Sequence, residues 1–308
     1  MEKLNISTLD FNHWAKGDHQ EKQLFLSYLR RSLQEPGFFF LDNHGMDQKI
    51  LDVSESKARS FFTQIREEER LGYTYAHLHH QIGYTPSGVE KGEFAKIADT
   101  KKFWQTNPNY SIPIVKEIPG FNQLTLQSYY EFEKIYTELM KAVAMTLELP
   151  ATYFSDHIGN SVMRDIFYPA HQNPVVDDGM VAEGGNALGM CASMHTDINF
   201  LTLLEAKEKG LQLWHEGRWM DITITKPGLI IVNCGDMLQH VTAGYYVSGM
   251  HRVVCQPNTP RYARPFFGHL KSGTSIVPLS QFRDFDAKRF RFKTTDEYLN
   301  FRLNQIGV

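Results

Sequence analysis

The sequence predicts an α+β fold, mainly β, in which a jelly-roll core follows an N-terminal helical region and is backed by helices. Two observations carry this prediction. Apolar residues recur at helical spacing in the first half of the chain, and short apolar segments separated by turn residues then run from Val162 to about Leu270. About eight such segments fit there, which is the strand number of a double-sheet jelly roll.

The N-terminal part of the chain is predicted to be largely helical. Apolar spacing indicates a helix over 21–35, which Pro36-Gly37 ends. A short buried strand is expected at Phe38–Leu41, followed by a second helix from about Asp47 to Glu69. The cluster of His77, His79 and His80 after it is expected to be a polar loop, because no carboxylate or cysteine shares its spacing.

The middle of the chain contains an irregular stretch and a long helix. Ser87 to Pro119 has scattered Gly, Pro and Lys and is predicted to be an excursion over the surface. Apolar residues from Tyr129 to Leu147 then mark one face of a helix that ends near Pro150. Such a face is typical of a helix that backs a sheet.

The second half is predicted to be strand-rich. The glycine-containing stretch Ala170–Met190 is expected to be a mobile flap, and a capping box at Thr294 to start a last helix through Phe301. The predicted strands are Met163–Tyr168, Ser193–Leu204, Leu211–Trp214, Trp219–Asp221, Leu229–Asn233, Met237–Val241, His251–Gln256 and Ala263–Leu270.

These elements divide the chain into four segments that are expected to form one compact unit. They are an N-terminal helical and mixed region (1–120), a backing helix (121–160), a jelly-roll core (161–275) and a C-terminal helical segment (276–308).

Composition excludes several classes of protein. The formal charge of −3 with well-mixed signs gives no electrostatic case for nucleic acid or an anionic membrane. No apolar run is long enough to span a membrane, and Met1–Ser7 lacks the apolar core of a signal peptide. Three widely spaced cysteines argue against a disulfide framework, and Cys191 is expected to be a buried thiol. We therefore expect a cytoplasmic protein.

A candidate metal site is centred on His195 and Asp197. In the predicted strand 193–204, residues two apart emerge on one face, so this imidazole and this carboxylate would lie together. The bare His-x-Asp pattern is common by chance in a chain with 13 histidines. His251 is our candidate for the third ligand, because two His and one carboxylate with open positions form the facial triad of non-haem Fe(II) oxygenases.

Arg261 lies ten residues beyond His251, after a turn marked by Pro257 and Pro260. An antiparallel strand pair could bring both residues into one cavity, where a guanidinium can bind a carboxylate in bidentate fashion. The alternative is a surface arginine in an ion pair. An acid that also chelates the metal would link the two features.

The order of these parts resembles the Fe(II)/2-oxoglutarate-dependent dioxygenases of the isopenicillin N synthase-like family. His251 follows Asp197 by 54 residues, and the resemblance covers most of the chain. The matching segments are 36–45 (the family's GFF…NHG), 164–169 (R-x-N-Y-Y-P), 210–213 with 217–219 (GLQV…G-x-W), 233–236 (N-x-GD) and 248–253 (its third-ligand strand).

The resemblance implies a function and a role for each matching residue. His195, Asp197 and His251 would hold Fe(II), and the cosubstrates would be 2-oxoglutarate and O₂. Arg261 and Tyr168 would hold the distal carboxylate of 2-oxoglutarate. It also implies a double-stranded β-helix, the distorted jelly roll, as the core.

The sequence departs from the family pattern at two positions. Ala263 stands where the family's R-x-S motif has a serine, and Ile166 stands where many members have asparagine. A hydroxyl hydrogen bond to a charged carboxylate contributes about 1.5–3 kcal/mol. The keto acid is therefore expected to bind loosely, to find another donor, or to be a different acid.

The expected function is an oxygenase that couples decarboxylation of 2-oxoglutarate to hydroxylation, desaturation or cyclisation of a small molecule. Phe103 and Trp104 lie where family members often line the substrate pocket, although they could equally anchor a surface loop. The alternatives are an oxidase resembling isopenicillin N synthase, which does not use 2-oxoglutarate, and a non-catalytic binder on the same fold. We expect a monomer or weak homo-oligomer.

Overall fold

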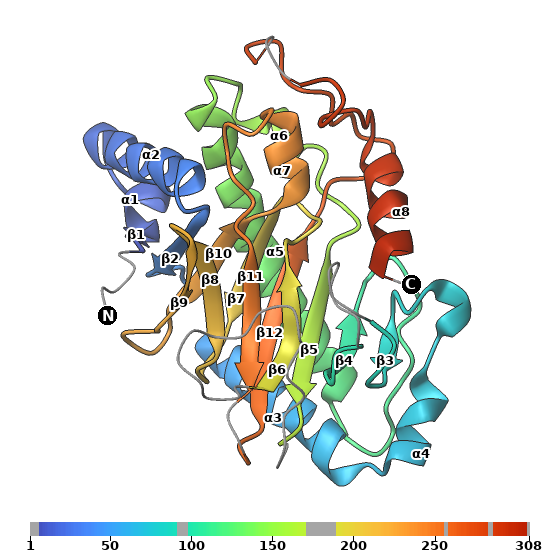
Figure 1. The fold of residues 1–308 in the computed structure, drawn as a ribbon. Helices are drawn as coiled ribbons and strands as arrows, with labels where there is room; N and C mark the ends of the chain where they lie inside the picture. Colours follow the sequence, from blue (N-terminus) through green and yellow to red (C-terminus); the bar gives the residue numbers. More distant parts are fainter. Residues whose placement is uncertain (1–5, 91–97, 171–188, 256–257, 283–285, 307–308) are drawn as a thin grey trace.

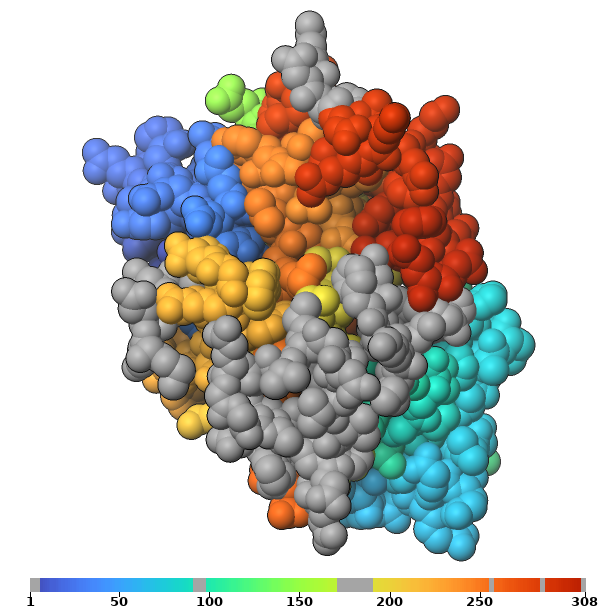
Figure 2. Space-filling view, in the orientation of Figure 1, coloured from blue at the N-terminus to red at the C-terminus, as the bar shows by residue number. Residues whose placement is uncertain are grey.

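The computed structural model describes residues 6–90, 98–170, 189–255, 258–282 and 286–306. The predicted flap at Ala170–Met190 falls almost entirely outside these residues. Among the described helices, none combines the length and the apolar character needed to cross a membrane. Figure 2 shows one face of the molecule, with the N-terminal helices (blue) and the C-terminal segment (red) on opposite sides.

The helices lie mostly at the two ends of the chain and in one long central segment (Figure 1). They are α1 (Phe11–Ala15), α2 (His19–Gln34), α3 (Gln48–Gln64), α4 (Glu67–Arg70), the short 3₁₀ helices η1 (Leu71–Tyr73) and η2 (Ala76–Leu78), α5 (Phe121–Thr146), α6 (Thr152–Ser155), α7 (Asp236–Val241) and α8 (Thr295–Ile306).

The strands form two sheets. The larger sheet has the order β1-β2-β10-β7-β12-β5-β4-β3, and the smaller has the order β6-β11-β8-β9. The strands are β1 (Thr8–Asp10), β2 (Phe38–Asp42), β3 (Gly83–Thr85), β4 (Lys102–Thr106), β5 (Val162–Tyr168), β6 (Gly189–His195), β7 (Leu201–Glu205), β8 (Leu211–His215), β9 (Arg218–Asp221), β10 (Ile230–Cys234), β11 (His251–Cys255) and β12 (Arg261–Gly268).

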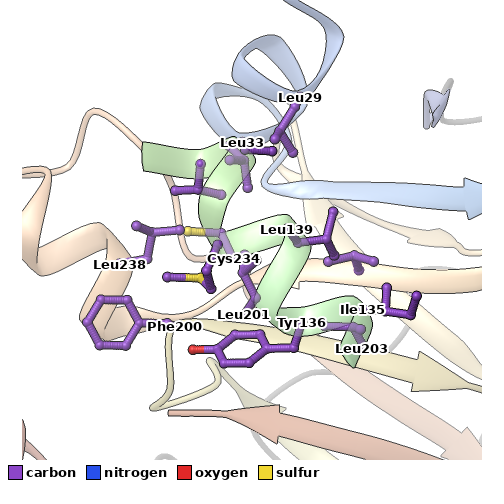
Figure 3. Close-up of a cluster of buried hydrophobic side chains, with 14 of the residues drawn as sticks. Leu29, Leu33, Ile135, Tyr136, Leu139, Phe200, Leu201, Leu203, Cys234 and Leu238 are labelled. Carbon is purple, nitrogen blue, oxygen red and sulfur yellow. The ribbon is translucent and has the colours of Figure 1, made fainter. Parts of the chain in front are cut away.

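The main hydrophobic core lies between the larger sheet and helix α5, as the apolar face of residues 129–147 predicts. On that face Tyr129, Phe132 and Tyr136 all contact the ring of Phe266 in β12. Figure 3 shows Leu29 and Leu33 of α2, Ile135, Tyr136 and Leu139 of α5, and Leu201 and Leu203 of β7 in one buried cluster. Helices α2 and α5 and strand β7 of the larger sheet therefore contribute to the same core cluster.

The structure confirms the predicted double-sheet core and corrects several elements. The predicted strand 193–204 is wrong, because β6 and β7 are separated by a loop over residues 196–200. The predicted strand Met237–Val241 is the short helix α7, and the predicted helix 47–69 is interrupted at residues 65–66. The supposed surface excursion 87–119 contains the buried strand β4.

The cysteines correct one further prediction. Cys234 is a buried free thiol. Cys191 in β6 is disulfide-bonded, so the prediction of a free thiol there is wrong.

Candidate metal centre

Two strands of the smaller sheet bring the candidate histidines together. His195 is the last residue of β6, His251 is the first of β11, and the antiparallel register places them directly opposite each other. Opposite residues on one face of such a pair have neighbouring side chains, and here the ring centres are 4.3 Å apart. The chain positions differ by 56 residues, so strand pairing alone creates this contact.

Asp197 reaches the same point from the loop after β6, and not from a strand face as predicted. The backbone N–H of Asp236 donates to the carbonyl oxygen of Asp197 at 2.7 Å, which fixes this loop. Gly235 permits the approach: a β-carbon there would lie 2.1 Å from the carbonyl oxygen of Asn199. This steric limit explains the glycine of the N-x-GD segment 233–236.

Hydrogen bonds leave one free ligand atom on each of the three side chains. The Nδ1 atoms of His195 and His251 lie 2.7 Å and 3.1 Å from the carbonyl oxygens of Ser193 and Gly249. Their Nε2 atoms lie 3.8 Å and 3.7 Å from Oδ1 of Asp197. Backbone carbonyls accept only, so both Nδ1 atoms carry the proton and both Nε2 atoms offer a lone pair.

The second carboxylate oxygen of Asp197 is held from the larger sheet. Thr202 Oγ1 in β7 donates to Asp197 Oδ2 at 2.6 Å, and Asn233 Nδ2 in β10 donates to it at 2.9 Å. Such outer hydrogen bonds orient metal ligands and raise metal affinity. Asn233 belongs to a segment singled out in the sequence, whereas nothing in the sequence pointed to Thr202.

Electrostatics keep His195 and Asp197 in their metal-binding protonation states. Burial, and then the neighbouring His251, lower the pKa of His195 to about 4. Burial raises the pKa of Asp197, but the two histidines and the hydrogen bonds from Thr202 and Asn233 outweigh it and lower that pKa overall. A neutral imidazole and an ionised carboxylate are the forms that ligate a cation.

The donor set fits Fe(II). The three ligand atoms lie within 4.8 Å of one another and come from two imidazoles and one carboxylate. Sulfur donors would favour zinc or copper, whereas two His and one carboxylate on one side of a metal suit non-haem Fe(II) and leave positions for other ligands. The site can therefore activate a molecule that binds beside the protein ligands.

Arg261 and Tyr168 lie side by side across the larger sheet. Arg261 in β12 is the register partner of Tyr168 in β5, and its guanidinium carbon lies 5.1 Å from the centre of the tyrosine ring. Nε of Arg261 donates to the carbonyl of Lys209 at 3.2 Å, but Nη1 is buried without a hydrogen-bond partner among the described residues. Burial also lowers the pKa of this arginine. A buried unpaired N–H is costly and calls for an acceptor such as a carboxylate.

The two residues that depart from the family pattern lie opposite each other on neighbouring strands. Ala263 is the register partner of Ile166, which in turn pairs with Phe103 in β4. The row beside Tyr168 and Arg261 is therefore wholly apolar where the resemblance would place two polar groups.

One cavity of about 180 Å³ joins the histidines to Arg261. Its walls include apolar side chains such as Phe38, Ile166 and Phe267, and the imidazole of His269. Burial lowers the pKa of His269 to about 4, so this imidazole is neutral at neutral pH. Of the residues proposed from the sequence, Phe103 and Trp104 do not line this cavity, since Trp104 packs against Phe61 and Phe121 in a separate core cluster.

Three charged residues in the cavity wall had no signal in the sequence. Glu90, Asp99 and Lys101 precede β4 in the stretch predicted to be a surface excursion, yet all three line the cavity. Lys101 Nζ lies 2.8 Å from Asp99 and 3.2 Å from Glu90, and Arg164 pairs with Glu90 at 3.0 Å. Arg164 and Glu90 are 74 residues apart, so no local pattern reveals the network as a whole.

A second group of carboxylates is explained without a metal. Asp52, Glu55 and Glu205 also place oxygens within 4.8 Å of one another. Lys207 Nζ lies 2.9 Å, 2.5 Å and 3.8 Å from them, respectively. An ion-pair network therefore accounts for this cluster.

Two family models match the chain. Residues 159–270 match the 2OG-Fe(II) oxygenase superfamily, and residues 6–124 match the non-haem dioxygenase N-terminal region named for morphine synthesis. The isopenicillin N synthase of Penicillium chrysogenum is 26% identical over 304 residues, covering 90% of this chain and 88% of that protein.

Solved structures show the same fold. A Caulobacter crescentus protein described as of the 2OG-Fe(II) oxygenase family is 29% identical, with a TM-score of 0.81 and coverage of 98% of this chain and 99% of that one. A full-length Neurospora crassa protein solved in complex with alpha-KG is 23% identical, with a TM-score of 0.81 and coverage of 97% and 96%. At that identity the second likeness supports the fold alone.

Proposed function

Because the chain belongs to the 2OG-Fe(II) oxygenase superfamily, we propose that its cavity performs Fe(II)- and 2-oxoglutarate-dependent hydroxylation, desaturation or cyclisation of a small molecule. In this proposal His195, Asp197 and His251 hold Fe(II). Arg261 and Tyr168 bind the distal carboxylate of 2-oxoglutarate beside the apolar position Ala263. The support is the convergence of three free ligand atoms and one guanidinium with an unpartnered nitrogen on a single cavity.

When bound, Fe(II) supplies the O₂ chemistry that decarboxylates the keto acid to succinate and oxidises a C–H bond of the substrate. The chain supplies position and environment. Arg261 anchors one end of the keto acid so that its 2-oxo acid end meets the metal side of the cavity. Asp197 keeps its charge because Thr202 and Asn233 bond it, and apolar walls exclude water.

The observation that carries the proposal is Nη1 of Arg261, which is buried in the same cavity as the triad and has no hydrogen-bond partner within the described part of the chain. The test is anaerobic: Fe(II) and then 2-oxoglutarate are added to the metal-free protein, and the visible charge-transfer band of a chelated keto acid is recorded. We expect a band that Asp197→Ala abolishes. The control is Asp52→Ala, which removes an exposed acid from the other carboxylate cluster and should leave the band unchanged.

One alternative is an oxidase that takes its electrons from the substrate, with Arg261 binding a substrate carboxylate. The apolar pair Ile166 and Ala263 lacks two polar contacts for any carboxylate held beside Arg261, so it does not distinguish a keto acid from a substrate acid. Iron binding without a band would support this oxidase. A protein that binds no iron would instead be a non-catalytic binder.

The remaining parts of the proposal concern the setting of the enzyme. We propose a cytoplasmic monomer or weak homo-oligomer. The mixed charge supports the further proposal that it does not act on nucleic acid. The substrate is a small molecule because the cavity is small. Phe103 does not line the cavity but supports its wall, since its ring centre lies 4.2 Å from the guanidinium carbon of Arg164, which does line it. Trp104 holds the same strand in the core.

A further inference from the structure

A buried carboxylate outside the triad is tied to the strand that carries His195. The side chain of Asp99 is only 3% exposed. Its Oδ1 accepts hydrogen bonds from the backbone N–H and from Oγ of Ser193, both at 3.2 Å. Its Oδ2 accepts from Lys101 Nζ at 2.8 Å. Both oxygens of Asp99 are thus used inside the protein.

Ser193 connects this carboxylate to the metal centre. Its carbonyl oxygen lies 2.7 Å from Nδ1 of His195, the contact that leaves Nε2 of His195 facing Asp197. One short segment is therefore held on one side by Asp99 and holds the imidazole on the other.

The strand needs such support at this point. β6 is an edge strand, paired only with β11 among the described strands. His195 pairs with His251 of β11, but the register shifts between this pair and the Val253–Ala192 pair, and shifts again between Val253 and Val254. A register shift leaves ladder groups without their usual partners, and Asp99 accepts the N–H of Ser193 there.

We propose that Asp99 is a positioning residue for the metal centre: it fixes Ser193, and Ser193 sets the orientation and tautomer in which His195 presents Nε2. The inference rests on the proposed function, since it takes His195 as a metal ligand. Lys101 pairs with the Asp99 oxygen that does not contact Ser193, and Lys101 is itself paired with Glu90, which pairs with Arg164.

The charges of this network are consistent with that role. Burial favours the neutral forms, but the Asp99 and Glu90 carboxylates raise the pKa of Lys101 above its usual value. Arg164 and Lys101 outweigh burial and lower the pKa of Glu90 to about 2. Lys101 and Glu90 therefore stay ionised across the neutral range, which keeps a cation beside the Asp99 oxygen that does not contact Ser193.

The test measures metal affinity with Co(II) as the probe, followed by its visible d–d bands in the full-length protein. We expect Asp99→Ala to weaken Co(II) binding about 10- to 100-fold, the usual effect of removing an outer partner of a metal-bound histidine, and to alter the d–d spectrum. Asp99→Asn keeps an acceptor oxygen for Ser193 and should restore most of the affinity. Ser193→Ala removes one of the two bonds and should give an intermediate loss.

The matched control is Asp165→Asn. Asp165 is another buried carboxylate, paired with Arg264 at 2.8 Å and outside the cavity. It should lower the thermal stability without changing Co(II) affinity. Wild-type Co(II) affinity in Asp99→Ala and Ser193→Ala, or an equal loss in Asp165→Asn, overturns the inference. A wild-type protein that binds no Co(II) overturns the proposed metal centre as well, which separates the two failures.

Discussion

Arg261 and the three proposed iron ligands lie in different parts of the cavity wall, and we expect them to bind different ligands. The guanidinium lies in β12 of the larger sheet, whereas both histidines lie in the smaller sheet. Arg261→Ala should therefore weaken 2-oxoglutarate binding roughly ten- to a hundredfold, the value of about 1.5–3 kcal/mol for hydrogen bonds to a charged group. Fe(II) affinity should stay nearly unchanged. Anaerobic titrations of the metal and of the keto acid measure the two affinities separately.

A suitable control for this variant is Arg252→Ala. Arg252 is buried next to His251, but its guanidinium stacks on Trp219 at 4.2 Å and does not line the cavity. It should leave keto-acid binding intact. Equal losses of iron in His251→Ala and Arg261→Ala would show that the proposed division of roles is wrong.

Glu90 gives the protein a specific acid sensitivity. Its pKa is lowered from 4.5 to about 2, because Arg164 and Lys101 outweigh burial. Because the pKa of Glu90 is lower in the folded state, its ionised carboxylate adds to the free energy of unfolding. This contribution is present above pH 4.5 and is lost as the pH falls towards 2. At neutral pH this contribution is on the order of 3 kcal/mol. In Glu90→Gln the free energy of unfolding should be lower at pH 7, and the difference from wild type should narrow below pH 4.5.

Urea unfolding at pH values from 7 to 3 measures this difference. The same substitution at Glu68, an exposed residue of α4, provides the comparison. A gap between Glu90→Gln and wild type that stays constant with pH would mean that Glu90 stabilises by packing and not by charge.

At the scale of elements, the β5–β12 register joins the two departures from the family pattern. Because Ile166 and Ala263 are direct partners, their side chains meet beside Arg261. Ala263→Ser alone should tighten 2-oxoglutarate binding, and Ile166→Asn with Ala263→Ser should tighten it by more than the two single effects combined. The band titration measures all four proteins. No change in any variant would mean that another donor already serves the keto acid.

Strand periodicity and strand pairing were not equally accessible from the sequence. The family-like motifs, in their order along the chain, supported the resemblance to the family, and that resemblance predicted the double-sheet core. The prediction of one continuous strand over 193–204 was wrong because an apolar run does not reveal a turn. Here the contacts of Asp236 and Gly235 with the segment around Asp197 hold it as a loop. Met237–Val241 is too short for periodicity to separate helix from strand.

Strand β4 and the charged network escaped prediction for a related reason. β4 buries the polar side chains Gln105 and Thr106, so its apolar alternation fails. Asp99 and Ser193 are separated by 94 residues, and only the fold reveals their bond. The proposed metal ligands can therefore be predicted from local sequence patterns. The groups that orient those ligands cannot, because long-range packing brings them into place.

At the scale of the whole molecule, the N-terminal region completes the sheet of the core. β2 pairs with β10 on one side of the strands from residues 161–275, and β4 pairs with β5 on the other. Both partners come from residues before 120, and helix α5 covers Phe266. If the segment 161–275 were produced on its own, its larger sheet would have two open strand edges and an uncovered apolar face.

We therefore expect the isolated segment 161–275 to be unfolded or aggregated, although it contains every proposed iron ligand. The full chain should unfold in one transition, with coincident midpoints by far-UV circular dichroism and by tryptophan fluorescence. The fluorescence reports on the whole molecule, since Trp14 lies in α1, Trp104 in β4, and Trp214 and Trp219 in the smaller sheet. Removal of residues 1–5 alone is the control and should leave both midpoints unchanged. A soluble 161–275 segment that binds Co(II) would instead show that the jelly roll is an independent domain and that the N-terminal strands merely dock on it.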